Sequence, residues 1–183
     1  MHRAVKYLSI VILMTGCLLM YAQNVNAASA QDIDNGIKIQ LENLKKISGA
    51  EDMLKRSKGA LIFPAVFQGG IGIGGAYGEG ALRIKNKTEA YYNIITGSIG
   101  FQLGGEKKTV VILFMTDPAL KEFRNASGWK AGVDASVALV ELGAGTSIDT
   151  AIANKPVVAF AFGRKGLMYN LVIEGAKVSR IKK

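Results

Sequence analysis

The chain has 183 residues, 49% of them hydrophobic, and its 23 Lys and Arg against 14 Asp and Glu give a formal net charge of +9. It has a single histidine, His2, and a single cysteine, Cys17, both close to the N-terminus. If the N-terminal segment is removed, the remainder lacks the residues of a Ser-His-Asp or Cys-His catalytic site, a disulfide, or a zinc site of the usual Cys/His kind. We therefore expect no catalytic residues, no metal and no cofactor, and a protein that is not an enzyme.

The first 27 residues predict a signal peptide and export to the periplasm or the cell envelope. Basic residues precede an apolar run at 8–21, and small residues suited to cleavage after Ala27 or Ala30 follow it. The run is shorter than the ~20 apolar residues that a membrane-spanning helix needs. The alternative is a lipoprotein anchored at Cys17, the last residue of an imperfect lipobox. Removal of the first 27 residues leaves 21 basic against 14 acidic side chains, a net charge of +7.

Two helices are expected after this segment. Residues 28–48 are expected to contain an amphipathic helix, because apolar residues recur there at steps of three and four, with acids in the first turn and Lys45 and Lys46 in the last. Two interpretations stay open: the helix docks on its own domain, or it contacts a membrane. A shorter helix is expected from Ala50 to Lys58, and residues 49–183 are expected to form one domain.

Strands dominate the rest of the chain. Short apolar or alternating runs are separated by glycine or charged turns, a spacing that favours antiparallel hairpins. A helix is expected to interrupt them, with Asp117 as N-cap, Pro118 at its first position and an end near Ala126. We therefore expect an α+β, β-dominated fold: a glycine-rich antiparallel sheet assembly, either a sandwich or a partly closed barrel, with N-terminal helices and one mid-chain helix. The expected strands are 60–67, 70–76, 79–86, 89–96, 98–104, 109–115, 131–140, 156–163, 166–173 and 175–181.

The glycines at 70–75 satisfy the G-x-G-x-x-G pattern of dinucleotide sites, but the pattern lacks its usual context. Further glycines and alternating residues follow, where a dinucleotide site needs a helix to begin. We interpret the segment as strand, with Gly70, Gly72 and Gly74 forming a flat face for close packing and Gly74-Gly75 forming a bulge or corner.

Several motifs in this chain are specific. They are Ile62-Phe63-Pro64, Gly69-Gly70, Gly74-Gly75, Tyr77-Gly78-Glu79-Gly80-Ala81-Leu82, Ala90-Tyr91-Tyr92-Asn93, 98–104, Leu113 to Asp117, Gly128 to Asp134, and Lys165 to Met168. Together they resemble the SYLF family, also described as the Ysc84-type or Las17-binding domain, and above all its exported single-domain members. The resemblance covers about residues 50–181. It implies a lipid-binding module without catalysis, since eukaryotic members bind phosphoinositide membranes and some bind actin.

The basic residues supply the candidate binding site. A net-basic domain favours anionic partners, and the nucleic-acid signature of basic residues interleaved with stacking aromatics is absent. We expect the partner to be an anionic phospholipid or another anionic envelope component, not nucleic acid, with actin only by family analogy. The alternative is a structural or protein-interaction component of the envelope, with a protein partner and no specific lipid binding. The candidate lipid-binding residues are Lys45, Lys46, Lys55, Arg56, Lys58, Arg83, Lys85 and Lys87.

Overall fold

The computed structural model of the protein describes residues 27–71, 73–99, 106–140, 152, 154–163, 166–167 and 175–183. Cys17 and all of the predicted signal peptide except Ala27 therefore lie outside the described residues, as do Gly72 and 100–105.

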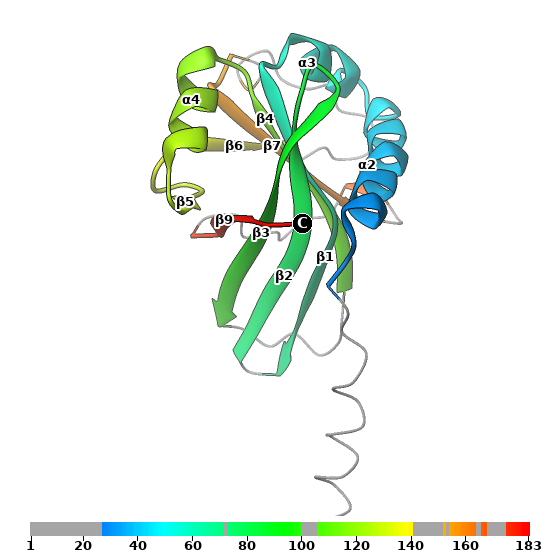
Figure 1. Cartoon of the computed structure of the whole chain (residues 1–183), viewed down its shortest axis with the longest axis vertical. Coiled ribbons are helices and arrows are strands. Elements are labelled where there is room, and N and C mark those ends of the chain that lie inside the picture. Colours follow the sequence, from blue (N-terminus) through cyan, green and yellow to red (C-terminus); the bar gives the residue numbers. More distant parts are fainter. Residues whose placement is uncertain are drawn as a thin grey trace, which may run out of the picture.

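The described strands form one curled sheet (Figure 1) with the order β5-β9-β3-β2-β1-β4-β7-β6, and β8 pairs with β7. Neighbouring strands are antiparallel except β6 and β7, which run parallel. The prediction of an α+β, β-dominated fold is confirmed, and the single curled layer corresponds to a partly closed barrel rather than a sandwich. The strands are β1 (Gly59–Ile71), β2 (Ile73–Ile84), β3 (Lys87–Ile99), β4 (Glu106–Phe114), β5 (Trp129–Lys130), β6 (Val137–Val140), β7 (Val157–Gly163), β8 (Gly166–Leu167) and β9 (Lys177–Ile181).

The named helices are α2 (Ala30–Lys45), α3 (Ala50–Arg56) and α4 (Asp117–Asn125). The first turn of α2 is closed by a capping box in which Ser29 and Asp32 bond each other's backbone N–H groups. The hydroxyl of Thr116 caps α4 by accepting a hydrogen bond from the Ala119 N–H at 3.4 Å. The prediction of Asp117 as N-cap is therefore wrong by one residue, because a threonine hydroxyl satisfies the same orphan donors.

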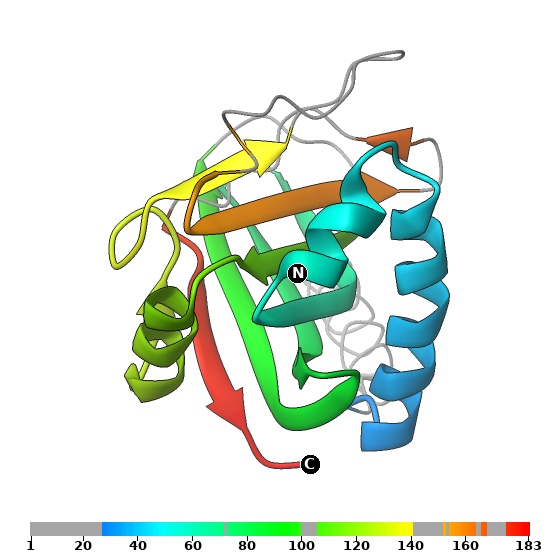
Figure 2. The same ribbon diagram turned by 90° about the horizontal axis from the view of Figure 1, so that it is seen from above.

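The sheet has two covered faces, with α2 on one and α4 on the other (Figure 2). The apolar stripe of α2, which includes Ile33 and Ile37, is buried with Ile62 of β1. On the opposite face the ring of Phe123 in α4 packs 5.0 Å from the ring of Tyr92 in β3. Since α2 buries its stripe against its own sheet, the docked interpretation of this helix is the one that the structure supports.

The glycine-rich segment is a β1–β2 hairpin, in agreement with the strand interpretation. Gly70 pairs with Gly74 and Gly69 with Gly75 in unbroken register, so the predicted bulge at Gly74-Gly75 is wrong. The irregularity lies instead in β1, between Ile62 and Ala65. It spans Pro64, and proline cannot donate a hydrogen bond to a ladder, which explains why the bulge forms there.

The bulge brings the backbone of β1 close to β2. A β-carbon added at Gly78 would lie 2.8 Å from the carbonyl oxygen of Ala65, and one added at Gly80 would overlap the carbonyl oxygen of Ile62. Backbone atoms cannot move aside as flexible side chains do. The Gly-x-Gly of the Tyr-Gly-x-Gly motif is therefore required by packing.

The C-terminus is tied to β2 by an ion pair. The Lys183 ammonium lies 2.8 Å from the Glu79 carboxylate, and each side chain is only 10% exposed. The same ammonium donates to the Ala28 carbonyl at 2.9 Å, and the Tyr77 hydroxyl donates to Glu79 at 2.8 Å. Burial raises the pKa of Glu79, but the bonds from Lys183 and Tyr77 outweigh it and hold that pKa below its ordinary value of 4.5.

We predict that Gly80→Ala lowers the free energy of unfolding by about 1–3 kcal/mol or more, because the new methyl group overlaps β1 backbone. Urea denaturation measures the loss. The matched control is Gly97→Ala, where a β-carbon meets nothing within 4 Å and stability should be unchanged or slightly raised. Equal stability of the two variants would contradict the packing argument.

We predict that Lys183→Met lowers the free energy of unfolding by about 1–3 kcal/mol at pH 7, because it removes a charge-assisted bond to Glu79. A carboxylate with a lowered folded pKa stabilises the fold above its unfolded pKa and loses that contribution as pH falls through the folded value. The difference from wild type should therefore shrink as pH is lowered from 4.5. Urea titrations from pH 7 to 3 measure it, with the exposed Lys182→Met as control; a pH-independent difference would contradict this account.

Candidate functional site

Six of the eight predicted lipid-binding residues fall into two separate places, and the other two, Lys55 and Arg56, lie in the last turn of α3. The β1–β2 register sets Ala60 opposite Arg83, so the start of β1 and the β2–β3 turn lie at one end of the sheet. That end gathers Lys58, Arg83, Lys85 and Lys87. Lys45 and Lys46 lie elsewhere. The Asp34 carboxylate of α2 accepts hydrogen bonds from Thr88 and Tyr91 near the start of β3. Lys45 lies about 16 Å further along the axis of α2 than Asp34.

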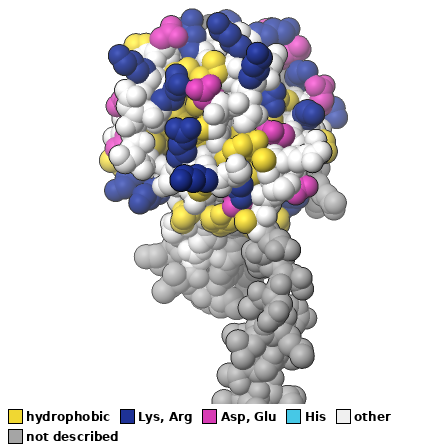
Figure 3. All heavy atoms as spheres, viewed as in Figure 1, with side chains coloured by type: hydrophobic (Ala, Val, Ile, Leu, Met, Phe, Trp, Pro, Cys, Tyr) yellow, Lys and Arg dark blue, Asp and Glu magenta, His cyan; other side chains and the backbone are white. Residues whose placement is uncertain are grey.

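Several of these cations have local partners. Lys45 pairs with Glu42 at 2.7 Å, Lys55 with Glu51 at 3.0 Å and Lys58 with Asp117 at 3.6 Å. The Arg83 guanidinium donates to the carbonyl of Asn86 within the β2–β3 turn. On the face seen in Figure 3, Lys and Arg side chains are spread over the surface with acids among them. The structure therefore does not unite the eight predicted residues in one patch, and their role in binding stays a prediction.

An exposed apolar row crosses the α2 face of the sheet. Phe67 of β1 pairs with Tyr77 of β2, and Tyr77 pairs with Ile95 of β3. Directly paired residues point to the same face, so the three side chains lie side by side. They are 60%, 46% and 49% exposed. We call Phe67, Tyr77 and Ile95 the apolar row.

Lysines lie at both ends of the apolar row. Lys107 of β4 pairs with Phe67 and places its ammonium 5.6 Å from the centre of the phenyl ring. At the other end Ile95 pairs with Lys177 of β9, which pairs in turn with Lys130 of β5. All three lysines are exposed. The acid next along β2 from Tyr77 is Glu79, whose charge is paired with Lys183.

A groove of about 590 Å³ continues the row toward α2. Its α2 wall includes Ile39, which is 61% exposed, and its sheet wall includes Phe67, Tyr77 and Lys107. The groove therefore adds a fourth exposed apolar side chain next to the row. Such contiguous exposed apolar surface is a feature of interaction sites.

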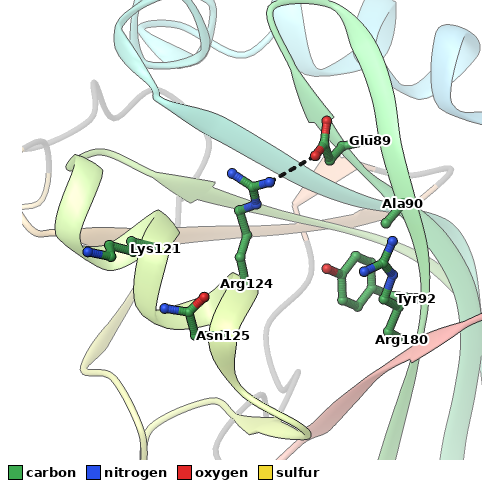
Figure 4. Close-up of a pocket in the computed structure, with 7 residues that line it drawn as sticks. All are labelled: Glu89, Ala90, Tyr92, Lys121, Arg124, Asn125 and Arg180. Atoms are coloured by element: carbon green, nitrogen blue, oxygen red, sulfur yellow. Dashed lines mark hydrogen bonds and ion pairs between the residues drawn. The ribbon is translucent and has the colours of Figure 1, made fainter.

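A second pocket, of about 450 Å³, lies on the opposite face of the sheet. In Figure 4, α4 contributes Lys121, Arg124 and Asn125 on one side, while Glu89 and Tyr92 of β3 and Arg180 of β9 form the other. We call it the α4 pocket. Arg124 reaches across it to Glu89 at 2.9 Å. Burial raises the pKa of Tyr92, while the charges of Arg180 and Arg124 act in the opposite direction.

Sequence reasoning missed both features because each joins residues that are distant in the chain. Phe67, Tyr77 and Ile95 each fit an ordinary strand pattern, and only the register places them side by side. In the α4 pocket, Arg124 lies within three residues of Lys121, but Arg180 comes from the last strand. A spacing of i and i+3 on the predicted mid-chain helix was the only local signal for that pair.

The described residues show neither a metal site nor a membrane-spanning helix. No group of three or more His, Cys, Asp or Glu among them could hold a metal ion. Likewise, no helix in this described part is long and apolar enough to cross a membrane.

Comparison with known families agrees with the motifs. Residues 95–183 match the model of the family described as Ysc84: Las17-binding protein actin regulator. The match begins inside β3 and takes in β4 to β9 and α4, and the glycine-rich motifs of β1 and β2 precede it. No curated protein matches the chain. The match confirms the resemblance drawn from the sequence motifs: the chain is a member of the Ysc84 (SYLF) family.

Proposed function

We propose that the protein is a non-enzymatic module that binds anionic membrane lipids through the apolar row and its flanking lysines. The observation that carries this proposal is the cross-strand arrangement itself. Three exposed apolar side chains adjoin in one line, with Lys107 at one end and Lys177 and Lys130 at the other. Membership of the Ysc84 family is consistent with it.

The geometry matches the two layers of a bilayer surface. Aromatic rings such as Phe67 and Tyr77 are suited to the interface between acyl chains and headgroups. When they insert there, lysines in the same row are carried to the level of the lipid phosphates. Each Lys near an anionic surface contributes about 1 kcal/mol, and salt screens that contribution.

The negative charge of Glu79, which lies next to the apolar row, is paired with a lysine. An unpaired carboxylate beside the row would repel anionic lipids, but Lys183 neutralises it at 2.8 Å. The predicted basic end at Lys58, Arg83, Lys85 and Lys87 lies further along the same strands. This basic end is a second candidate for the membrane contact, and substitutions at Lys85 and Lys87 distinguish it from the apolar row.

We predict that Phe67→Ala lowers the partition coefficient onto anionic vesicles about ten-fold, since an exposed phenyl group is lost from the interface. We expect Lys107→Gln to lower it about five-fold at low salt and less at high salt. Co-sedimentation with phosphatidylglycerol, phosphoinositide or neutral phosphatidylcholine vesicles measures both. The matched controls are Val133→Ala, also exposed but outside the row, and Lys155→Gln.

Three outcomes would contradict the proposal as stated. Equal binding to neutral vesicles, or no binding to any vesicle, would remove the anionic-lipid function. Losses in a Lys85→Gln, Lys87→Gln double variant without losses at Phe67 would move the contact to the predicted basic end. A stoichiometric envelope protein recovered together with absent lipid binding would favour the alternative of a protein-interaction component.

We propose also that the protein is exported and cleaved after Ala27. The backbone N–H of Ala28 bonds the Glu79 carboxylate, and Ser29 begins the capping box of α2. Cleavage after Ala27 would turn the Ala28 N–H into an ammonium group beside that carboxylate, so processing would strengthen an existing contact.

Mass spectrometry of the protein from its natural source tests this. We expect an N-terminus at Ala28, and the processed form should be more stable than the same form with an acetylated Ala28 amine. A diacylglycerol-modified Cys17 would show the lipoprotein alternative instead.

A further inference from the structure

The α4 pocket lies on the opposite face of the sheet from the apolar row. On β3, Tyr92 points to the face that carries α4, whereas Tyr91 bonds Asp34 of α2 on the other face at 3.0 Å. Ile95 shares the face of Tyr91, two alternations along the strand. A membrane engaged by the row therefore lies across the sheet from the pocket. A soluble ligand of the pocket does not depend on that contact, and a lipid headgroup would reach the pocket only from a membrane on the α4 face.

The charges of the pocket select an anion. Three cations, Lys121, Arg124 and Arg180, line it against one acid, Glu89. The Arg124–Glu89 pair is exposed, at 49% and 46%, and pairs of this kind contribute little to stability, so opening it for a ligand costs little. Among the described residues, neither Lys121 nor Arg180 has a carboxylate partner.

The donors of the pocket suit a phosphate group in particular. Two guanidiniums come from opposite walls, Arg124 from α4 and Arg180 from β9, and each presents a planar fork that matches two oxygens of a phosphate. The amide of Asn125 is a further neutral donor, and the hydroxyl of the buried Tyr92 is another. The volume of about 450 Å³ holds a phosphate group together with part of the molecule that carries it.

We propose that the α4 pocket binds a phosphate group, carried either by a soluble phosphomonoester or by the headgroup of a phosphomonoester lipid. Arg180 and Arg124 hold the phosphate oxygens from the two walls, and Lys121 adds charge at the α4 side. Glu89 holds Arg124 in position when the pocket is empty and opposes the bound phosphate, so it sets the affinity.

Phosphate titration of the full chain tests the proposal. Inorganic phosphate and glycerol phosphate are added at constant ionic strength, with chloride as the balancing anion, and binding is followed by calorimetry and by thermal melting. We expect saturable binding that Arg180→Gln weakens about ten-fold, since one charge-assisted bond is lost. The control is Lys155→Gln, which removes an exposed lysine outside the pocket and should leave the affinity unchanged.

A second variant keeps the test independent of folding defects. Glu89→Gln removes the one acid among the described residues that line the pocket, and should tighten phosphate binding about three- to ten-fold. A variant that merely disturbed the fold would not bind more tightly. Absence of a saturable response in the wild type, or an affinity that neither Arg180→Gln nor Glu89→Gln changes, would overturn the proposal.

Vesicles distinguish the two sources of phosphate. Phosphatidic acid carries a phosphomonoester and phosphatidylglycerol does not. If Arg180→Gln abolishes a preference for phosphatidic acid, the site takes a lipid headgroup; if it weakens only the response to glycerol phosphate, the site takes a soluble ligand. The Phe67→Ala variant should keep its affinity for glycerol phosphate, which separates failure of this site from failure of membrane docking.

Discussion

The close approach of two backbones, β1 and β2, is the contact on which the rest of the structure depends. The bulge at Pro64 brings carbonyl oxygens of β1 to positions that a β-carbon at Gly78 or Gly80 would occupy. The contact therefore allows one register, in which Phe67 stands opposite Tyr77. A slip of one residue would turn one strand's side chains to the other face and break up the apolar row. Gly78 and Gly80 of the Tyr-Gly-x-Gly motif thus act through sheet register.

Register also separates the two candidate sites. Side chains of β3 alternate between the α2 face, where Tyr91 and Ile95 lie, and the α4 face, where Tyr92 lies. One face presents apolar surface with flanking lysines, and the other presents a pocket with arginines on two walls. Because the sheet stands between them, the two sites can be occupied at once, by a flat surface and by a compact anion.

What the sequence predicted was local, and what it missed depended on register. Helix periodicity, strand alternation and the helix start at 116–118 are set by neighbours in the chain, and the structure has helices and strands in these places. The strand bounds differ: β1 and β2 are longer than the predicted strands, and the predicted strand 70–76 is divided between them. The predicted bulge at Gly74-Gly75 failed because the bend is determined by Pro64 on the partner strand. Tyr92 has no basic residue within three positions in sequence, yet it lines a pocket with Arg124 and Arg180. The family could be recognised from the sequence because each of its motifs is a run of neighbouring residues.

Net positive charge favours an anionic partner but does not locate the contact. Cations in the last turns of α2 and α3, such as Lys45 and Lys55, pair with acids one turn earlier and serve the helix that carries them. Lys107 and Lys177 instead lie in line with exposed apolar side chains. In the proposed membrane contact, only cations in that position would meet lipid phosphates at the same moment that apolar surface leaves water. A membrane-binding surface needs lysines and exposed apolar side chains side by side on one face. In this fold, cross-strand pairing places Lys107 next to Phe67 and Lys177 next to Ile95 on the same face of the sheet.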